Sequence, residues 1–238
     1  MIQILQHHDC EGLAYLATMM AARELDWKVL RADRGEIPKD LNGLDALIIL
    51  GGPQSVNRTD LFPWMRREIE IVRLAIDAGL PVLGICLGAQ VVAAACGMQV
   101  VNCDHKEIGW FPVRLLANGS EGWFADVPEE FTCFHWHGER MIPHEDMPSL
   151  AATDVTPCQA CSPLPGVLAL QFHLEVTEEA IRAMAAAFHK EMADELIGLD
   201  SLLWELPEQL ANSQRLADNV IGRWFERVMA RDAFGEAE

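Results

Sequence analysis

Basic residues are scarce in this sequence. Of its 238 residues, 18 are Lys or Arg and 36 are Asp or Glu, which gives a formal net charge of -18 at pH 7. Proteins that bind nucleic acid or an anionic membrane surface present a basic patch to it. The composition therefore argues against nucleic acid and membrane as partners and leaves a small-molecule substrate open.

The sequence also lacks the marks of a secreted, disulfide-stabilised chain. Its seven cysteines are an odd number, and they are scattered along a chain too large to need disulfides for stability. The first eight residues contain neither Lys nor Arg and no long apolar run, so we expect no signal peptide. Both features favour reduced thiols and a cytoplasmic location.

Charged residues are missing from Ala78 to Cys103, a stretch long enough to span a bilayer. Several glycines, together with Pro81, Gln90 and Gln99, interrupt it. A membrane-spanning helix tolerates such interruptions poorly. The stretch is therefore better explained as a buried strand, a turn, a helix and a further strand.

Short apolar runs alternate with helical patterns in the first hundred residues. We expect strands at 2–5, 27–32, 44–50 and from Val82, and helices at 9–25 and 61–76. This alternation predicts an α/β fold with a parallel sheet and right-handed crossovers. Functional groups in such sheets gather at the carboxyl ends of the strands.

The pattern changes after Gly97. Strands are expected at 98–102, 108–116, 131–135, 150–154 and 167–172 without long helices between them, which indicates an antiparallel or mixed extension of the same sheet. A helix capped by Thr177 follows, and residues 201–231 are helical again, with Leu216, Val220, Trp224 and Val228 on one face.

The segment Gly84-Ile85-Cys86-Leu87-Gly88 is the thiol version of the G-x-S-x-G nucleophile elbow. A hydrophobic run leads into it, and small apolar residues lead out. Glycine is needed on either side of the nucleophile because a Cβ would clash where strand and helix close together. The start of a helix favours thiolate over thiol. Cys86 is therefore a candidate nucleophile.

A cysteine nucleophile needs a base and a group that orients the base. The segment Gln171-Phe172-His173-Leu174-Glu175 offers both, since His173 and Glu175 point to the same side of an extended chain. The apolar strand before His173 places the imidazole at a strand end, beside the elbow. A surface polar pair is the alternative explanation for this H-x-E segment on its own.

Four segments together give the sequence a clear resemblance to the class I, triad-type glutamine amidotransferases, close to the amidotransferase domain of GMP synthase and its stand-alone relatives. They are 51–56, 84–90, 135–139 and 171–176. The resemblance covers roughly residues 1 to 190. It implies a flavodoxin-like open α/β sheet, mostly parallel with an antiparallel extension and with helices on both faces. We expect this domain at residues 1–195, with a helical extension at 196–238 packed on it.

The resemblance also implies roles for individual residues. Cys86 would be the nucleophile, His173 the acid and base, and Glu175 its orienter. The backbone N–H groups of Gly52 and Leu87 would form the oxyanion hole, and the substrate would contact Gln90, Trp136, His137 and Gly138. The sequence departs from the family at Leu174, where proline is more common, and at Trp136, where many relatives have a small polar residue.

The implied reaction releases ammonia and glutamate from glutamine through a γ-glutamyl thioester, without a metal or another cofactor. The sequence has no phosphate-binding P-loop, so a synthase that uses the ammonia would be a separate protein. Trp136 leaves open a γ-glutamyl peptidase that acts on a larger amide. A regulatory protein with a vestigial site is a third reading, against which the intact triad weighs.

Other polar clusters have plainer explanations. The C-x-x-C segment from Cys158 to Cys161 lacks a second pair at zinc spacing. The segment from His7 to Cys10 is read as a loop at a strand end, although it contains metal-ligand types. His135 and His137 would be a metal pair in isolation, and the family resemblance makes them substrate-loop residues instead.

Overall fold

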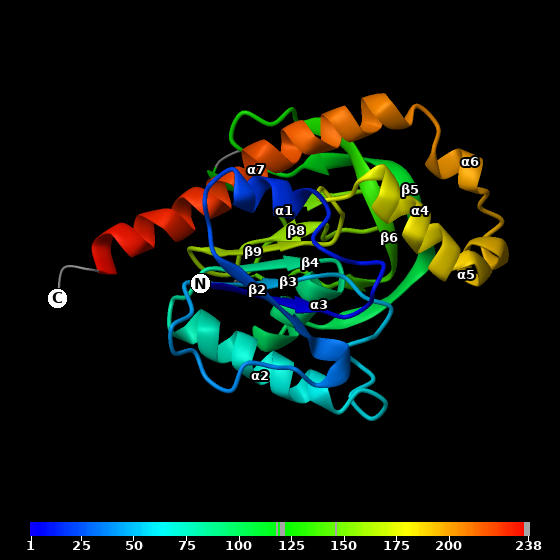
Figure 1. Cartoon of the computed structure of the whole chain (residues 1–238). Helices are drawn as coiled ribbons and strands as arrows, with labels where there is room; N and C mark the ends of the chain where they lie inside the picture. The colour runs from blue at the N-terminus through cyan, green and yellow to red at the C-terminus, as the bar shows by residue number, and fades with distance from the viewer. Residues whose placement is uncertain (118, 120–121, 146, 236–238) are drawn as a thin grey trace.

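The chain folds around one mixed sheet in the computed structural model, which describes residues 1–117, 119, 122–145 and 147–235 (Figure 1). Within these residues the sheet has nine strands in the order β2-β1-β3-β4-β9-β8-β7-β5-β6. The first five strands of this order run parallel to one another, and the remaining pairings are antiparallel. The predicted mostly parallel α/β sheet with an antiparallel extension is confirmed.

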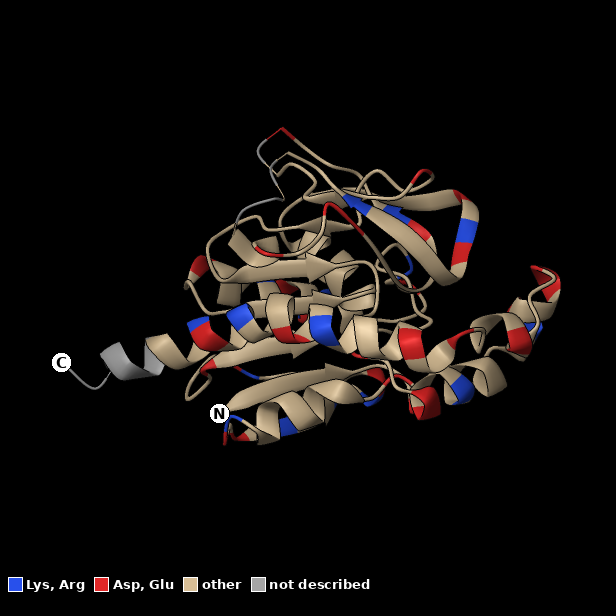
Figure 2. Cartoon of the chain, turned by 90° about the horizontal axis from the view of Figure 1, so that it is seen from above, with Lys and Arg blue, Asp and Glu red and all other residues tan. Residues whose placement is uncertain are grey.

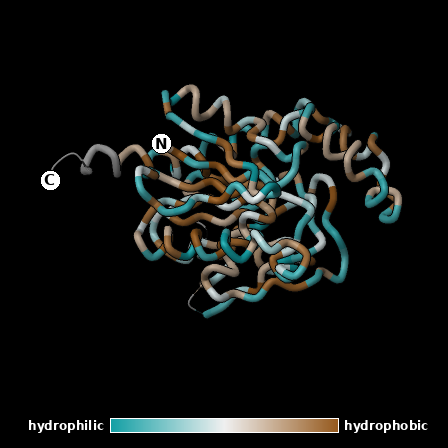
Figure 3. The backbone as a smooth tube through the Cα atoms, turned by 60° about the horizontal axis from the view of Figure 1, so that its bottom comes forward, coloured by the Kyte–Doolittle hydropathy of each residue, from teal (hydrophilic) through white to brown (hydrophobic). Residues whose placement is uncertain are grey.

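The parallel half consists of β1 (Ile2–Gln6), β2 (Trp27–Arg31), β3 (Ala46–Ile49), β4 (Val82–Ile85) and β9 (Val167–Leu170). Strands β3, β4 and β9, which are neighbours in the middle of the sheet, are buried along their whole length. Charged residues lie on the helices, the loops and the outer strands, and the central strands are hydrophobic (Figures 2 and 3). Burial on both faces explains these continuous apolar runs.

The antiparallel half consists of β8 (Ala160–Cys161), β7 (Ala151–Ala152), β5 (Val100–Leu115) and β6 (Glu130–Met141). Two of the expected strands, 98–102 and 108–116, are one long strand, β5, whose pairing register shifts between Asn102 and Glu107. Strand β8 was not predicted, because two residues are too few to produce a pattern.

The segment from Trp136 to Gly138 lies in β6, and its prediction as a loop is wrong. The expected strand 131–135 continues to Met141 because every residue from Glu130 to His137 has a partner on β5. The segment predicted to contact the substrate therefore lies in a strand at the edge of the sheet.

Helices cover both faces of the sheet. One face packs against α1 (Tyr15–Ala21) and α7 (Leu206–Gly235), and the other packs against α2 (Trp64–Asp77) and α3 (Leu87–Ala95) (Figure 1). A third cluster joins β5 and β6 to α4 (Glu178–Ala187), α5 (His189–Asp194) and α6 (Leu199–Leu202). Two short 3-10 turns lie at Ala32–Arg34 and Gly122–Phe124.

One predicted helix was too long, and another is interrupted. The helix expected at 9–25 spans only Tyr15–Ala21, because the residues after β1 form a loop at the carboxyl edge of the sheet. The helix capped by Thr177 is broken at Phe188, where φ is -108° and ψ is 26°. The cap itself is confirmed, since the Thr177 side chain accepts a hydrogen bond from the Ala180 N–H.

The predicted apolar face of the C-terminal helix is confirmed. Leu216, Val220, Trp224 and Val228 are all buried in the same core as β1, β3, β4 and β9, and the Trp224 indole donates to the Gly166 carbonyl at 3.0 Å. We propose that residues 196–238 belong to the same folding unit as residues 1–195, although 236–238 lie outside the described residues. None of the described helices is long and apolar enough to cross a membrane.

This proposal predicts a large effect of Trp224→Ala. The side chain is fully buried, so its removal should lower the free energy of unfolding by about 3–5 kcal/mol. Chemical denaturation followed by circular dichroism measures this loss in a single transition. The control is Trp204→Ala, because Trp204 is 69% exposed and its loss should cost less than about 0.5 kcal/mol. An unchanged main transition in Trp224→Ala would show that α7 is a separate appendage.

Candidate active site

Cys86 sits on a strained turn between β4 and α3. Its φ is 53° and its ψ is -108°, a conformation that residues other than glycine rarely adopt. A Cβ on Gly84 would strike the Gly88 carbonyl, and a Cβ on Gly88 would strike the Ile49 carbonyl. The predicted strand–turn–helix geometry is therefore observed, and the two glycines permit the close packing that it requires.

His173 and Glu175 lie beside this turn. The His173 N–H donates to the Phe134 carbonyl at 2.8 Å, which joins the segment after β9 to strand β6. His173 Nδ1 is 2.6 Å from Glu175 Oε1, and both side chains are buried. Since Glu175 occupies Nδ1, Nε2 is the ring nitrogen available to the Cys86 sulfur. The three residues predicted as a triad are brought together.

Burial and nearby charges have opposing effects on the pKa values of Cys86 and His173. Burial raises the pKa of the Cys86 thiol, although its interaction with His173 opposes the rise. Burial alone would lower the pKa of His173, but Glu175 and Cys86 outweigh it and raise this pKa well above 6.5. The predicted preference for thiolate at the helix start is thus opposed by burial, and Glu175 draws the proton shared by Cys86 and His173 toward the imidazole.

A cavity of about 290 Å³ opens in front of Cys86. All the predicted oxyanion and substrate residues line it, namely Gly52, Leu87, Gln90, Trp136, His137 and Gly138. At the cavity wall, the Cys86 Sγ contacts the Trp136 carbonyl oxygen at 3.5 Å. Segments far apart in the sequence therefore meet at the carboxyl edge of the parallel strands, as expected.

Gly52 and Leu87 lie side by side next to Cys86. A Cβ on Gly52 would be 3.0 Å from Leu87 Cδ2 and 2.5 Å from both Gln54 Oε1 and His7 Cβ, so only glycine fits. Leu87 is the first residue of α3, where backbone N–H groups have no partner within the helix. The arrangement suits two N–H donors that stabilise an oxyanion.

Gln90 lies one turn into α3 and is almost fully buried. Its Nε2 donates to the Glu139 carbonyl and to Gln171 Oε1, both at 3.3 Å. Gln171 in turn places its Nε2 3.8 Å from the Cys86 Sγ. Gln171 was not predicted as a site residue, although it belongs to the same segment as His173.

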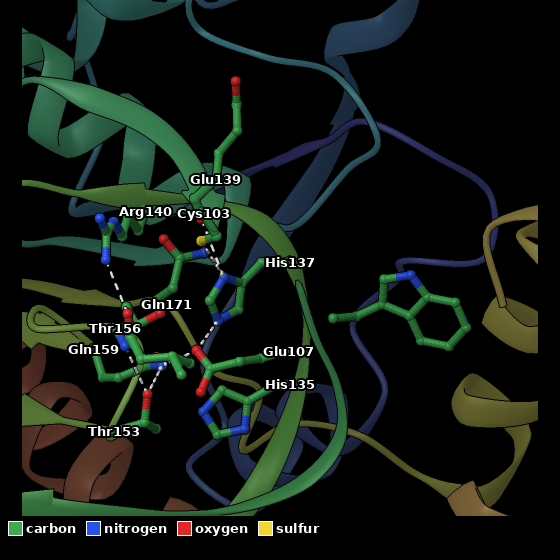
Figure 4. A network of polar contacts seen from close by, with 12 residues as sticks. Cys103, Glu107, His135, His137, Glu139, Arg140, Thr153, Thr156, Gln159 and Gln171 are labelled. Atoms are coloured by element: carbon green, nitrogen blue, oxygen red, sulfur yellow. Dashed lines mark hydrogen bonds and ion pairs between the residues drawn. The ribbon is translucent and has the colours of Figure 1, made fainter. Parts of the chain in front are cut away.

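His137 faces a buried polar network instead of presenting its ring to the cavity (Figure 4). Its Nε2 is 3.1 Å from Glu107 Oε2, and Gln159 Nε2 donates to the same oxygen at 2.7 Å. Burial opposes ionisation of Glu107, but contacts with His137 and Thr153 outweigh it and lower the pKa to about 2. The network fixes the backbone of β6 where it borders the cavity.

The rings of His135 and His137 lie next to each other in β6, with centroids 5.7 Å apart. Burial and the nearby His137 lower the pKa of His135 to about 3, so this ring is neutral. No group of three or more His, Cys, Asp and Glu side chains within the described residues is arranged to hold a metal ion. All seven cysteines are free thiols, and Cys158 and Cys161 are fully buried away from the cavity.

A second buried pair supports the segment before Gly52. His7 Nδ1 is 3.1 Å from the Leu50 carbonyl oxygen and His7 Nε2 is 2.9 Å from Glu68 Oε1. Both partners are acceptors, so both ring nitrogens donate and the ring is an imidazolium. Burial alone would lower the pKa of His7, but Glu68 outweighs it and raises this pKa. The sequence pattern predicts only a loop here and gives no sign of this pair.

The sequence pattern also gives no sign of the role of Glu11. Its side chain lines the cavity together with Phe188 and Glu191 of the α4–α5 break and α5. Burial raises the pKa of Glu11 to about 7. Its position after the first parallel strand could have indicated a site residue, because functional groups gather at the carboxyl ends of such strands. The prediction of a helix at 9–25 assigned Glu11 to that helix instead.

Comparison with known proteins gives consistent results. Residues 8–190 match the family model described as glutamine amidotransferase class-I. The chain is 31% identical over 162 residues to glutamine amidotransferase-like protein YfeJ of Salmonella typhimurium, with 66% of this chain and 68% of that protein covered. It is 32% identical over 162 residues to one subunit of the glutamine-hydrolysing GMP synthase of Thermoplasma acidophilum, with 63% and 77% covered.

A solved structure shows the same fold. A glutamine amidotransferase from Thermotoga maritima superposes with a TM-score of 0.87 at 22% identity, over 94% of this chain and 97% of that one. The predicted flavodoxin-like fold is thereby confirmed.

The His7–Glu68 pair predicts a pH-dependent loss of stability in Glu68→Gln. The folded-state pKa of His7 lies above its ordinary value of 6.5, so the pair stabilises the fold fully below pH 6.5. This contribution is lost as the pH rises through the raised pKa. We expect Glu68→Gln to lower the free energy of unfolding by about 3 kcal/mol at about pH 6 and by less at about pH 9.

Urea unfolding at both pH values measures this difference. Glu70→Gln on the same helix is the matched control, since the Glu70 side chain is 51% exposed and its loss should cost less than about 0.5 kcal/mol at either pH. An equal loss at both pH values in Glu68→Gln would contradict the imidazolium assignment.

Proposed function

The chain belongs to the class I glutamine amidotransferase family, and we propose that it hydrolyses the γ-carboxamide of glutamine at Cys86. The observation that carries this proposal is the convergence of Cys86, His173 and Glu175 beside one cavity. A strained, glycine-flanked thiol with an oriented imidazole is the arrangement that acyl transfer through a thioester requires.

The proposed reaction has two halves. The Cys86 sulfur attacks the amide carbon, the C–N bond breaks, and His173 gives a proton to the departing nitrogen. Water then attacks the γ-glutamyl thioester with His173 as base, the C–S bond breaks, and glutamate is released. Glu175 keeps the imidazole oriented and favours its protonated form throughout. The N–H groups of Gly52 and Leu87 stabilise the oxyanion in both halves.

Gln90 and the main chain of β6 would hold the amino-acid end of the substrate. Gln90 lines the cavity and donates to the Glu139 carbonyl of β6, and Trp136 to Gly138 of the same strand line it as well. The ring of His137 contributes through Glu107, which fixes this wall. These residues therefore place the amide carbon in front of the sulfur.

A larger γ-glutamyl amide is a second candidate substrate. The observation that favours it is the outer wall of the cavity, where the Trp136 indole donates to Glu191 at 3.0 Å and packs on Phe188. Glutamine would use only the main chain of Trp136 in the proposed site, so the Trp136 indole, Glu191 and Phe188 remain for a larger leaving group. The second candidate keeps the same triad and the same thioester.

Use of the ammonia by a separate synthase is the last part of this proposal. The Thermoplasma acidophilum relative is named as one of the subunits of GMP synthase, and the free thiols of this chain suit a cytoplasmic reaction.

A synthase partner would raise the rate of glutamate release when cell extract is added to the purified protein, as measured by coupled glutamate assay. Loss of this stimulation after the extract is heated would agree with a protein partner, and unchanged release with fresh extract would contradict one.

Cys86→Ala should abolish glutamate release from glutamine, because no other thiol faces the cavity among the described residues. The measurement is glutamate production by purified protein. Cys96→Ala is the matched control, since Cys96 ends the same helix away from the cavity and its loss should leave the rate within about twofold. Undiminished glutamate release by Cys86→Ala would contradict the assignment of the triad.

The two candidate substrates are separated by their kcat/KM values. For a glutamine-specific site, glutamine should exceed a panel of γ-glutamyl dipeptides by roughly tenfold or more, since discrimination by pocket contacts has this size. A preference for the dipeptides would instead support the second candidate. A protein that hydrolyses none of them, and whose Cys86 is not labelled by a thiol-directed glutamine analogue, would be a binding protein with a vestigial site.

A further inference from the structure

Glu11 has no role in the proposed reaction, although it lies in the catalytic cavity. Glu11 is 9% exposed, and its side chain forms no hydrogen bond or ion pair within the described part of the chain. A Cβ on Gly51 would strike Glu11 Oε2 and would lie 3.2 Å from His173 Cε1. The carboxyl group is therefore held beside the His173 ring and faces the cavity without a partner.

This position is on the side of the leaving group. His173 delivers its proton to the departing nitrogen, so that nitrogen lies next to the imidazole. Gln90 has other neighbours: it contacts Glu139 and Gln171, whereas Glu11 lies against Gly51 and His173. The amino-acid end of a γ-glutamyl substrate therefore extends toward Gln90, and a substituent on the amide nitrogen extends toward Glu11.

The other charged groups of the cavity already have partners. Glu191 accepts from Lys106 at 2.7 Å and from the Trp136 indole at 3.0 Å. Glu139 Oε1 accepts from the Ser55 hydroxyl at 2.8 Å. Lys106 also lies 3.6 Å from Glu195, so its charge is neutralised twice. Among the described acids that line this cavity, Glu11 is the one whose side chain has neither a hydrogen bond nor an ion pair, and a cation is the ligand that would complete it.

We propose that Glu11 binds an ammonium group on the leaving amine, so that the preferred substrates are γ-glutamyl amides of amines that carry a second, cationic amino group. This inference rests on the proposed thioester reaction at Cys86. The products are glutamate and the free diamine: the amide C–N bond breaks, His173 supplies one proton to the amine, and water supplies the oxygen of the new carboxylate.

The electrostatics of the site agree with this assignment. Burial raises the pKa of Glu11 to about 7, an effect that His173 and His7 oppose and that Glu175 and Glu191 reinforce. A bound ammonium would favour the carboxylate form. A carboxylate on the leaving amine would instead meet Glu11 and Glu191, so γ-glutamyl peptides with a free carboxyl end are disfavoured.

The test compares three amides of similar length at about pH 8. They are the γ-glutamyl amides of diaminobutane, which is cationic, of pentylamine, which is neutral, and of aminobutyrate, which is anionic. We expect the wild-type kcat/KM to be roughly tenfold or more higher for the cationic than for the neutral amide, the size of one charge-assisted hydrogen bond. The anionic amide should be the poorest of the three.

Glu11→Gln should bring the ratio of cationic to neutral kcat/KM close to one. A ratio is used because a general loss of active enzyme cancels in it. Asp9→Asn is the matched control: it removes an acid from the same loop, but the Asp9 side chain is 77% exposed and pairs with Arg31, so the ratio should be unchanged.

The outcomes separate this inference from the proposed function. A wild-type protein that hydrolyses glutamine without preferring the cationic amide overturns the role of Glu11, and so does a preference that survives in Glu11→Gln. The wild-type comparison stands even where the variant fails to fold. A protein that hydrolyses neither glutamine nor any of the three amides overturns the thioester reaction itself.

Discussion

The close approach of α3 to β3 and β4 is the constraint on which the site depends. Gly88 lies against the Ile49 carbonyl and Gly84 against the Gly88 carbonyl, so the chain passes from strand to helix with no room for a Cβ at either position. Cys86, at the middle of this turn, has a positive φ of 53°. Packing on both sides keeps the sulfur in this strained position, which an isolated turn would relax.

The same packing buries ionisable side chains of the site. Burial raises the pKa of both Cys86 and Glu11, and the site compensates with imidazoles that neighbouring carboxylates hold in the charged form. Glu175 does this for His173 and Glu68 does it for His7. One pair lies beside the candidate nucleophile, and the other holds the Leu50 carbonyl two residues before Gly52 of the predicted oxyanion hole. Two buried ion pairs thus support two adjacent segments of the site.

The sequence predicted the parts of this site that local motifs specify. The spacing of Gly84, Cys86 and Gly88, and of His173 and Glu175, follows from contacts within a few residues. The wall at Trp136 was misread as a loop because its extended conformation comes from pairing with β5, a partner far away in the sequence. Glu11 was misassigned to a helix because only its place after β1 distinguishes it from an ordinary surface acid.

The position of Glu11 depends both on the packing around the triad and on the burial of its charge. Packing brings the loop after β1 against the triad, where the Glu175 carbonyl accepts from the Tyr15 N–H at 2.8 Å and the His8 ring packs on Phe188. A buried carboxyl group without a hydrogen bond destabilises the empty protein, because burial penalises its charge and His173 and His7 offset only part of the penalty. A cationic leaving amine would remove that penalty while its amide lies at the sulfur, and it would leave once the C–N bond is broken. The burial of the Glu11 carboxyl group would therefore account both for selectivity toward the amine and for destabilisation of the free site.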